Sequence, residues 1–255
     1  MSLLARTVAP YLLDRHRAGV LRTAHGGASR LAPDNTLEAI VAALAVPLDF
    51  VEVDVHLTRD GELLLWHDPQ LVTQDGLFEI ARHSLAELRG LELIDGTLST
   101  LPQAIEAVRG RCGLMIDLKA PDLEGPIMEA LRRAAFEDAV ICGGFTRTLA
   151  ALKLGLPEMG VSLTPELEFY RDPAAGLSVL PFLDAVTVYW RGIGPELMRA
   201  ARAAGVLVLA WTVDHPHVAA HLLAQGVHGV TSNNLDLLAG LARESGPPMT
   251  NRSGS

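Results

Sequence analysis

The 255-residue chain has only two cysteines, Cys112 and Cys142, and neither belongs to a C-x-x-C motif. So few cysteines argue against a disulfide framework or a zinc-binding cysteine cluster, and we expect both thiols to be reduced core residues. The chain also lacks an apolar run of the roughly 18 residues that a membrane span needs. We therefore expect no stable membrane anchor.

The N-terminal residues 1–19 lack a basic region followed by an uninterrupted apolar one, which argues against a signal peptide. They are more typical of a short amphipathic helix lying against the fold, and a cytoplasmic location follows. Basic residues are also outnumbered by acidic ones, 21 to 30, which gives a formal net charge of −9. Nucleic-acid binding needs clustered Lys and Arg, so we expect no nucleic-acid partner.

What the chain does have is enough apolar residues for a large core, with 49% hydrophobic residues and a mean hydropathy of +0.26. Short apolar, β-branched runs alternate with longer segments of helical periodicity, and eight such strand–helix units can be counted. The pattern predicts an α/β protein built as a single (β/α)8 TIM barrel over residues 1–243. A short helical extension would precede it, a small excursion would follow the second strand, and residues 244–255 would form a disordered tail.

Two helix starts can be predicted from local signals. Ser84 and Glu87 have the spacing of a capping box, and Thr100 opens a helix with Pro102 in its first turn. The segment 169–180 is less regular. These signals matter for function because the chemistry of such a barrel lies where the strands end.

Polar residues gather at the expected carboxyl ends of the first three strands. Glu52 and Asp54 are two residues apart on one strand, so both side chains point to the barrel interior. Asp117 and Lys119 repeat that spacing on the next barrel strand. Two histidines flank the group, His25 after the first strand and His67 after the excursion.

Three converging carboxylates form a hard, oxygen-rich site suited to Mg²⁺ or Ca²⁺. Two histidines can serve as general acid and base, and a lysine can hold an anionic oxygen, which together suggests phosphoester chemistry. Simpler roles remain open for each residue. Asp117 could cap a helix, Glu52 and Asp54 could pair with Lys119 without a metal, and His67 could belong to a plain turn. His56 shares the face of Glu52 and is expected only to line the site.

The stretches AHGGASRLAPDNTLEAI (24–40), FVEVDVHLTRDGELLLWHDP (50–69) and MIDLK (115–119) together resemble the glycerophosphodiester phosphodiesterase family. The resemblance implies a metal-dependent phosphodiesterase that splits small glycerophosphodiesters into glycerol 3-phosphate and an alcohol. By position it implies one divalent cation, Mg²⁺ or Ca²⁺, held by Glu52, Asp54 and Asp117. It further implies an acid–base pair of His25 and His67, a phosphate contact from Lys119, and an aromatic near the glycerol moiety, Trp211.

The chain departs from the family pattern at several positions. Gly26 stands where the family has Arg, and we expect Arg30, in the same loop, to reach back as a substitute phosphate contact. Asp34 and Asp117 each stand where the family has Glu. Two alternative functions stay open, namely a phospholipase or lyase of the same superfamily that releases a cyclic phosphate, and a non-catalytic barrel that binds a phosphodiester. The sequence sets no oligomeric state.

Overall fold

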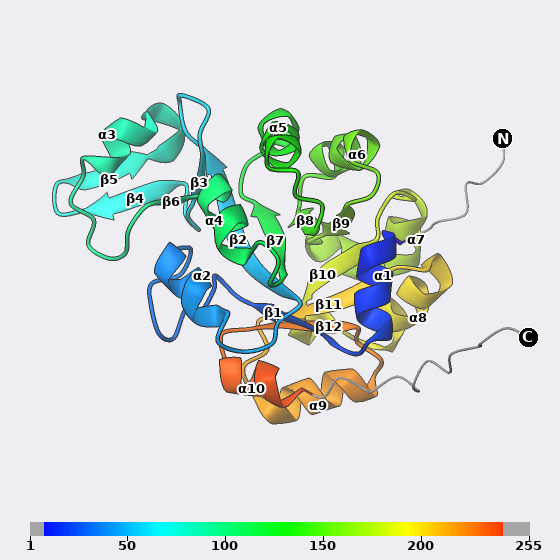
Figure 1. The fold of residues 1–255 in the computed structure, drawn as a ribbon. Coiled ribbons are helices and arrows are strands. Elements are labelled where there is room, and N and C mark those ends of the chain that lie inside the picture. The colour runs from blue at the N-terminus through cyan, green and yellow to red at the C-terminus, as the bar shows by residue number, and fades with distance from the viewer. Residues whose placement is uncertain (1–7, 242–255) are drawn as a thin grey trace, which may run out of the picture.

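The computed structural model describes residues 8–241, and its centre is a ring of parallel strands (Figure 1). β1 pairs with β2 on one side and with β12 on the other, which closes the ring. The predicted (β/α)8 barrel is therefore confirmed. Its strands in chain order are β1 (Leu21–Ala24), β2 (Phe50–Leu57), β7 (Gly113–Leu118), β8 (Ala139–Gly143), β9 (Gly160–Leu163), β10 (Ala185–Tyr189), β11 (Leu207–Trp211) and β12 (Gly229–Ser232).

Helices cover the outside of the ring and bury their apolar faces against it. The expected start at Thr100 is confirmed, since Thr100 and Gln103 form a capping box and Pro102 lies in the first turn of α4. The irregular segment consists of the short helices η2 (Leu167–Arg171) and α7 (Pro173–Ser178). The other helices are α2 (Leu37–Ala43), α4 (Leu101–Val108), α5 (Glu124–Ala134), α6 (Thr146–Gly155), η3 (Trp190–Gly192), α8 (Pro195–Ala204), α9 (Pro216–Ala224) and α10 (Leu235–Gly240).

The amino-terminal end of the barrel is closed by α1 (Pro10–Arg17), as expected for an amphipathic extension. Ala9 and Leu12 are fully buried and pack against the first residues of the strands, such as Leu21 and Phe50. α1 therefore covers this end of the barrel interior, opposite the carboxyl ends of the strands. Residues 1–7 lie outside the described part of the chain.

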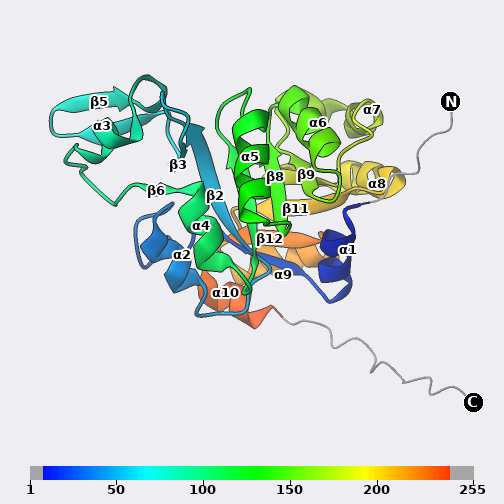
Figure 2. The same ribbon diagram turned by 45° about the horizontal axis from the view of Figure 1, so that its top comes forward.

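The excursion leaves the barrel at the carboxyl end of β2 and projects from one side of the ring (Figures 1 and 2). It has an apolar core of its own, formed by Leu64, Leu71, Ile80 and Leu88. The predicted capping box of Ser84 and Glu87 opens α3. The excursion contains β3 (Leu63–Leu65), β4 (Gln70–Thr73), β5 (Gly76–Glu79), η1 (Ile80–Arg82), α3 (Leu85–Arg89) and β6 (Ser99–Thr100).

β3 runs antiparallel to β2, with Leu65 opposite Val55, and this pairing decides where His67 lies. The amide of Trp66 donates to the Asp54 carbonyl at 3.1 Å, so the chain returns to the mouth of the barrel one residue before His67. The antiparallel return of β3 thus brings one histidine back to the carboxylates of β2.

Three further expectations concern composition. Cys112 and Cys142 are free and buried, as predicted. Among residues 8–241 no helix is both long and apolar enough to cross a membrane. Residues 242–255, which include the predicted tail 244–255, lie outside the described part of the chain.

Candidate active site

A cavity of about 150 Å³ opens at the carboxyl ends of the barrel strands. Strands from all around the ring contribute to it, and most of the polar residues singled out in the sequence are among its walls. Met115 and Cys142, which also belong to the apolar cluster inside the barrel, supply less polar parts of its wall. The lining residues are His25, Glu52, Asp54, His67, Met115, Asp117, Lys119, Cys142, Thr164, Thr187, Trp211 and Thr231.

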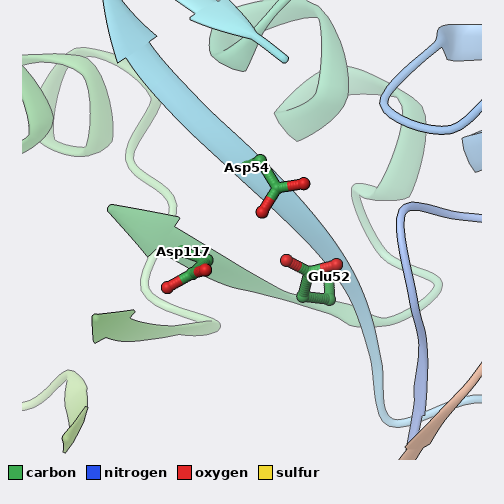
Figure 3. Close-up of side chains that lie close together, drawn as sticks. All are labelled: Glu52, Asp54 and Asp117. Carbon is green, nitrogen blue, oxygen red and sulfur yellow. The ribbon is translucent and has the colours of Figure 1, made fainter. Parts of the chain in front are cut away.

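Three carboxylates from two neighbouring strands converge at this cavity (Figure 3). Asp54 on β2 is paired in register with Asp117 on β7, and Glu52 lies two residues earlier on the face that Asp54 shares. One carboxylate oxygen from each residue lies within 4.8 Å of the others. The alternation of side chains along β2 is the local cause, and the parallel pairing of β2 with β7 supplies the third carboxylate.

Backbone and amide groups hold two of these carboxylates in place. Glu52 Oε2 accepts a hydrogen bond of 2.8 Å from the amide of Gly26. The Asn35 side chain clamps Asp54 twice, because its Nδ2 donates to Asp54 Oδ2 at 2.8 Å and its Oδ1 accepts from the Asp54 amide at 2.8 Å. Asp54 and Glu52 are only 3% and 5% exposed, so these contacts replace hydration that burial removes.

Lys119 lies between the two aspartates. Its Nζ is 2.8 Å from Asp54 Oδ1 and 2.6 Å from Asp117 Oδ2. Burial acts to lower the pKa of Lys119, but the charges of Asp117 and Asp54 outweigh it, so the pKa is raised and the ammonium stays charged. Burial likewise acts to raise the pKa of Asp54, but Lys119 and the Asn35 amide lower it below its usual value. The ion pair of Lys119 with Asp54 considered above is thus present, but its second partner is Asp117 and not Glu52 as considered there.

Glu52 has a different electrostatic environment. Burial, and then the charges of Asp54 and Asp117, raise its pKa well above the ordinary value. One ammonium does not offset three carboxylates at such short range, and Lys119 is paired with Asp54 and Asp117 rather than with Glu52. A divalent cation would offset the remaining negative charge. The donor set is made only of carboxylate oxygens, which suits Mg²⁺ or Ca²⁺, so the residues fit the expected ion.

His67 faces the cavity from the excursion, and its side chain remains 61% exposed. Its Nδ1 lies 2.8 Å from Asp68 Oδ1. The ring of His56 contacts the His67 carbonyl, at 3.2 Å from His56 Nε2. His56 is not among the cavity walls, so it differs from the expected lining role and instead supports the backbone that carries His67.

His25 lines the cavity from the loop after β1, and its Nδ1 lies 2.9 Å from Asn233 Oδ1. Lys119, His25 and the three carboxylates therefore surround one space, as the sequence predicted. His67 reaches the same space only through the β2–β3 pairing.

Arg30 lies elsewhere than expected. Its guanidinium is paired with Asp214 Oδ2 at 3.2 Å, its side chain is 52% exposed, and it does not line the cavity. Gly26 adopts a φ of +59°, and a Cβ there would come within 2.7 Å of Asp34 Cβ. The backbone that directs the Gly26 amide to Glu52 is thus one that glycine adopts most easily. Of the lysines and arginines in residues 8–241, it is Lys119 that lines the cavity.

Trp211 forms the wall at the end of β11, where its Nε1 donates to the Thr187 carbonyl at 3.2 Å. The ring of Tyr189 lies 5.6 Å away. Beside these rings opens a second hollow of about 820 Å³, which shares Thr164, Thr187 and Trp211 with the first cavity. The two together hold a ligand considerably larger than a phosphate group.

Several residues of the site were not assigned roles from the sequence. Asn35 lies within the quoted PDNT stretch, so a signal for it existed. Cys142 and Thr231 give no such signal, because a thiol and a hydroxyl at strand positions are common in any core. Thr231 Oγ1 is buried and finds no hydrogen-bond partner among the described residues, although it lines the cavity. Asn233 became recognisable only from its contact with His25.

Comparison with known proteins gives concordant matches. The model of the "Glycerophosphoryl diester phosphodiesterase family" matches residues 25–135 and 157–237. A glycerophosphodiester phosphodiesterase from Caldanaerobacter subterraneus subsp. tengcongensis is 26% identical over 239 residues, covering 88% of this chain and 98% of that protein. An Oleispira antarctica phosphodiesterase, solved in complex with the product sn-glycerol-3-phosphate, superposes with a TM-score of 0.71 at 26% identity, covering 85% of this chain and 94% of that one.

A glycerophosphodiester phosphodiesterase structure from Thermotoga maritima gives a TM-score of 0.73 at 21% identity. It covers 88% of this chain and 98% of that one, and this likeness bears on the fold.

Proposed function

The chain belongs to the glycerophosphoryl diester phosphodiesterase family and is a phosphoric diester hydrolase, and we propose that it splits a small glycerophosphodiester into glycerol 3-phosphate and an alcohol. The observation that carries this proposal is the convergence of Glu52, Asp54 and Asp117 beside two histidines in one cavity. These residues lie within or beside the stretches that resemble the family. The adjoining hollow leaves room for a substrate with groups on both sides of its phosphate.

In the proposed site, Glu52, Asp54 and Asp117 hold one divalent cation, Mg²⁺ or Ca²⁺. When bound, such an ion polarises phosphoryl oxygens and offsets the charge that develops on them. The raised pKa of Glu52 supports this assignment, because burial, and then the charges of Asp54 and Asp117, disfavour its ionised form, and a cation at this point would favour it. Binding of the ion would require Glu52 to lose its proton.

His25 and His67 form the proposed acid–base pair. One ring accepts the proton of the attacking hydroxyl, and the other donates a proton to the departing alkoxide oxygen. Asp68 supports His67 in this role, because its Oδ1 lies 2.8 Å from His67 Nδ1 and orients the ring. Lys119 reaches the same space and is the proposed contact for a phosphate oxygen, which requires its ammonium to move from between Asp54 and Asp117 or to be shared with the substrate.

The proposal is tested by following glycerophosphocholine with phosphorus NMR, in Mg²⁺, in Ca²⁺ and in chelator. We expect glycerol 3-phosphate to appear only with a divalent cation. Asp54→Asn should abolish its release, because the change removes a ligand charge, whereas Asp236→Asn on the exposed surface of α10 should not alter it. Activity that survives both chelator and Asp54→Asn would refute the metal role.

The phosphorus NMR spectra, together with melting temperatures, separate the alternatives. Accumulation of a cyclic phosphate would favour the lyase. A diester panel that raises the melting temperature without any turnover would favour the binding protein.

A further inference from the structure

A chain of hydrogen bonds connects His25 to the far end of the sequence. His25 follows β1, Asp214 follows β11 and Asn233 follows β12, so three adjacent strand ends bring them together. Asn233 Oδ1 lies 2.9 Å from His25 Nδ1. On its other side, Asn233 Nδ2 donates to Asp214 Oδ2 at 2.9 Å, and the Asn233 amide donates to Asp214 Oδ1 at 2.8 Å.

The direction of each hydrogen bond follows from Asp214. Partial burial acts to raise the pKa of Asp214, but hydrogen bonds from Asn233 and Ser232 outweigh it and lower the pKa, so the group is an ionised carboxylate. An ionised carboxylate only accepts, which makes the Asn233 nitrogen the donor to it and turns the amide oxygen toward His25. His25 Nδ1 must then carry a proton to donate. In the ring so held, Nε2 is the nitrogen left to exchange a proton with a ligand in the cavity.

The Asn233 oxygen is also fully used. Ser29 Oγ donates to it at 2.8 Å, so a carbonyl oxygen with two lone pairs accepts two hydrogen bonds. At the other end of this series of hydrogen bonds, the Arg30 guanidinium lies 3.2 Å from Asp214 Oδ2. The Asn233 amide has one orientation that satisfies its partners, because its rotation would set the NH₂ against His25 Nδ1–H.

We propose that Asn233, oriented by Asp214, is a positioning residue that fixes the ring plane and tautomer of His25 so that Nε2 addresses the cavity. The inference rests on the proposed role of His25 in proton transfer. It also gives Arg30 a function distinct from phosphate binding, since its charge helps keep Asp214 ionised. Misplacing a reacting group by about 1 Å can cost about 100-fold in rate, and we expect a loss of that order when Asn233 is removed.

The first test compares Asn233→Ala with Asn234→Ala. Asn234 caps α10 through its Oδ1, and its Nδ2 donates to the Asp214 backbone carbonyl rather than to the carboxylate. Asn233→Ala should lower kcat about 100-fold with little change in KM. Asn234→Ala should lower the melting temperature and leave kcat close to wild type. Equal losses of kcat in both variants would overturn the proposal, since they would indicate general damage to this loop.

The second test places Asn233→Ala in a His25→Ala background. If Asn233 acts through His25, it has nothing left to position there, and the residual kcat of His25→Ala should not fall further. A second fall of the full size would overturn the proposal. A fully active His25→Ala enzyme would refute the proposed role of His25, and the inference with it. An inactive His25→Ala together with a fully active Asn233→Ala would overturn the inference alone.

A third test exchanges the two partners. Asn233→Asp alone sets two carboxylates against each other and should lose kcat. Adding Asp214→Asn restores a donor to the Asp side chain at 233 while Oδ1 at 214 still accepts from the 233 amide and from Ser232. The double variant should therefore recover most of the lost kcat. A double variant no more active than Asn233→Asp would count against the proposed geometry.

Discussion

Replacing Lys119 by Met tests whether the ammonium and a divalent cation serve the same carboxylates. Lys119 Nζ lies within 2.8 Å of Asp54 and Asp117, and its side chain is 21% exposed. Removing one partner of a buried ion pair costs about 3–5 kcal/mol. Because Lys119 is partly exposed, we expect Lys119→Met to lower the free energy of unfolding by about 3 kcal/mol in chelator.

Mg²⁺ should reverse much of that loss, because an ion held by Glu52 and the two aspartates supplies the missing positive charge. In a thermodynamic cycle, a loss of unfolding free energy that is present without the ion and largely absent with it must appear as tighter ion binding by the variant. With 1.4 kcal/mol for each factor of ten, the variant should bind Mg²⁺ about 10- to 100-fold more tightly than wild type. Its kcat should nevertheless fall, since the proposed phosphate contact is gone.

The measurement is urea unfolding followed by circular dichroism, in chelator and across a Mg²⁺ titration. Lys153→Met provides a matched control, because Lys153 and Lys119 are the only lysines of the chain. Lys153 Nζ is 2.9 Å from Asp184, its side chain is 17% exposed, and the pair is remote from the cavity. The loss of unfolding free energy in Lys153→Met should be similar in size to that in Lys119→Met and independent of Mg²⁺. Unchanged or weaker Mg²⁺ binding by Lys119→Met would refute the reasoning.

Three further predictions concern single residues. Gly26→Arg and the control Gly26→Ala should both lose about 1–2 kcal/mol of unfolding free energy and show no gain in kcat/KM, because φ is +59° and the Gly26 amide must reach Glu52. A more active Gly26→Arg variant would mean that this backbone relaxes at little cost. Burial, and then the neighbouring charge of His16, lower the pKa of His228 to about 4, so its contribution to stability is present above pH 6.5 and is lost as pH falls from there to 4, by about 2 kcal/mol at pH 5. His228→Asn, which keeps an acceptor near the Val208 amide, should reduce the loss of unfolding free energy between pH 7 and 5, and an unchanged pH profile would contradict the assignment. Thr231→Val should leave the protein at least as stable, because the buried Thr231 hydroxyl lacks a partner among the described residues. It should raise KM about 5-fold, because the substrate would lose its contact with this hydroxyl. An unchanged KM would indicate that the substrate does not use it.

Local patterns were sufficient to predict most of the fold. The alternation of short apolar runs and helical segments predicted eight units, and a barrel follows because strands of uniform length with intervening helices can close on one another. Helix starts such as Thr100 could be read from capping residues, since capping depends only on neighbours in the chain. The excursion was predicted in place, but its apolar core was not, because Leu71 and Leu88 meet only when the segment folds back on itself.

The convergence of the carboxylates was predictable for the same kind of reason. A two-residue spacing puts Glu52 and Asp54 on one face of any strand, and neighbouring parallel strands end at the same edge, so Asp117 had to lie near them. His25 also follows a parallel strand that ends there, whereas His67 returns to this edge after β3, which is antiparallel to β2. The two-residue period of a strand and the parallel arrangement of its neighbours are thus enough to predict that the three carboxylates lie together, without any knowledge of side-chain torsions.

The sequence by itself determined the barrel and the group of charges at its mouth, because both depend on periodicity along the chain. Only the tertiary structure decided how these charges are partnered. Lys119 turns to Asp54 and Asp117, Arg30 turns to Asp214, and Asn233 meets His25 across 208 residues. Periodicity does not select these partners, because the contacts of Arg30 with Asp214 and of Asn233 with His25 require ring closure, and every pair depends on which rotamer satisfies the most hydrogen bonds once the strand ends are assembled.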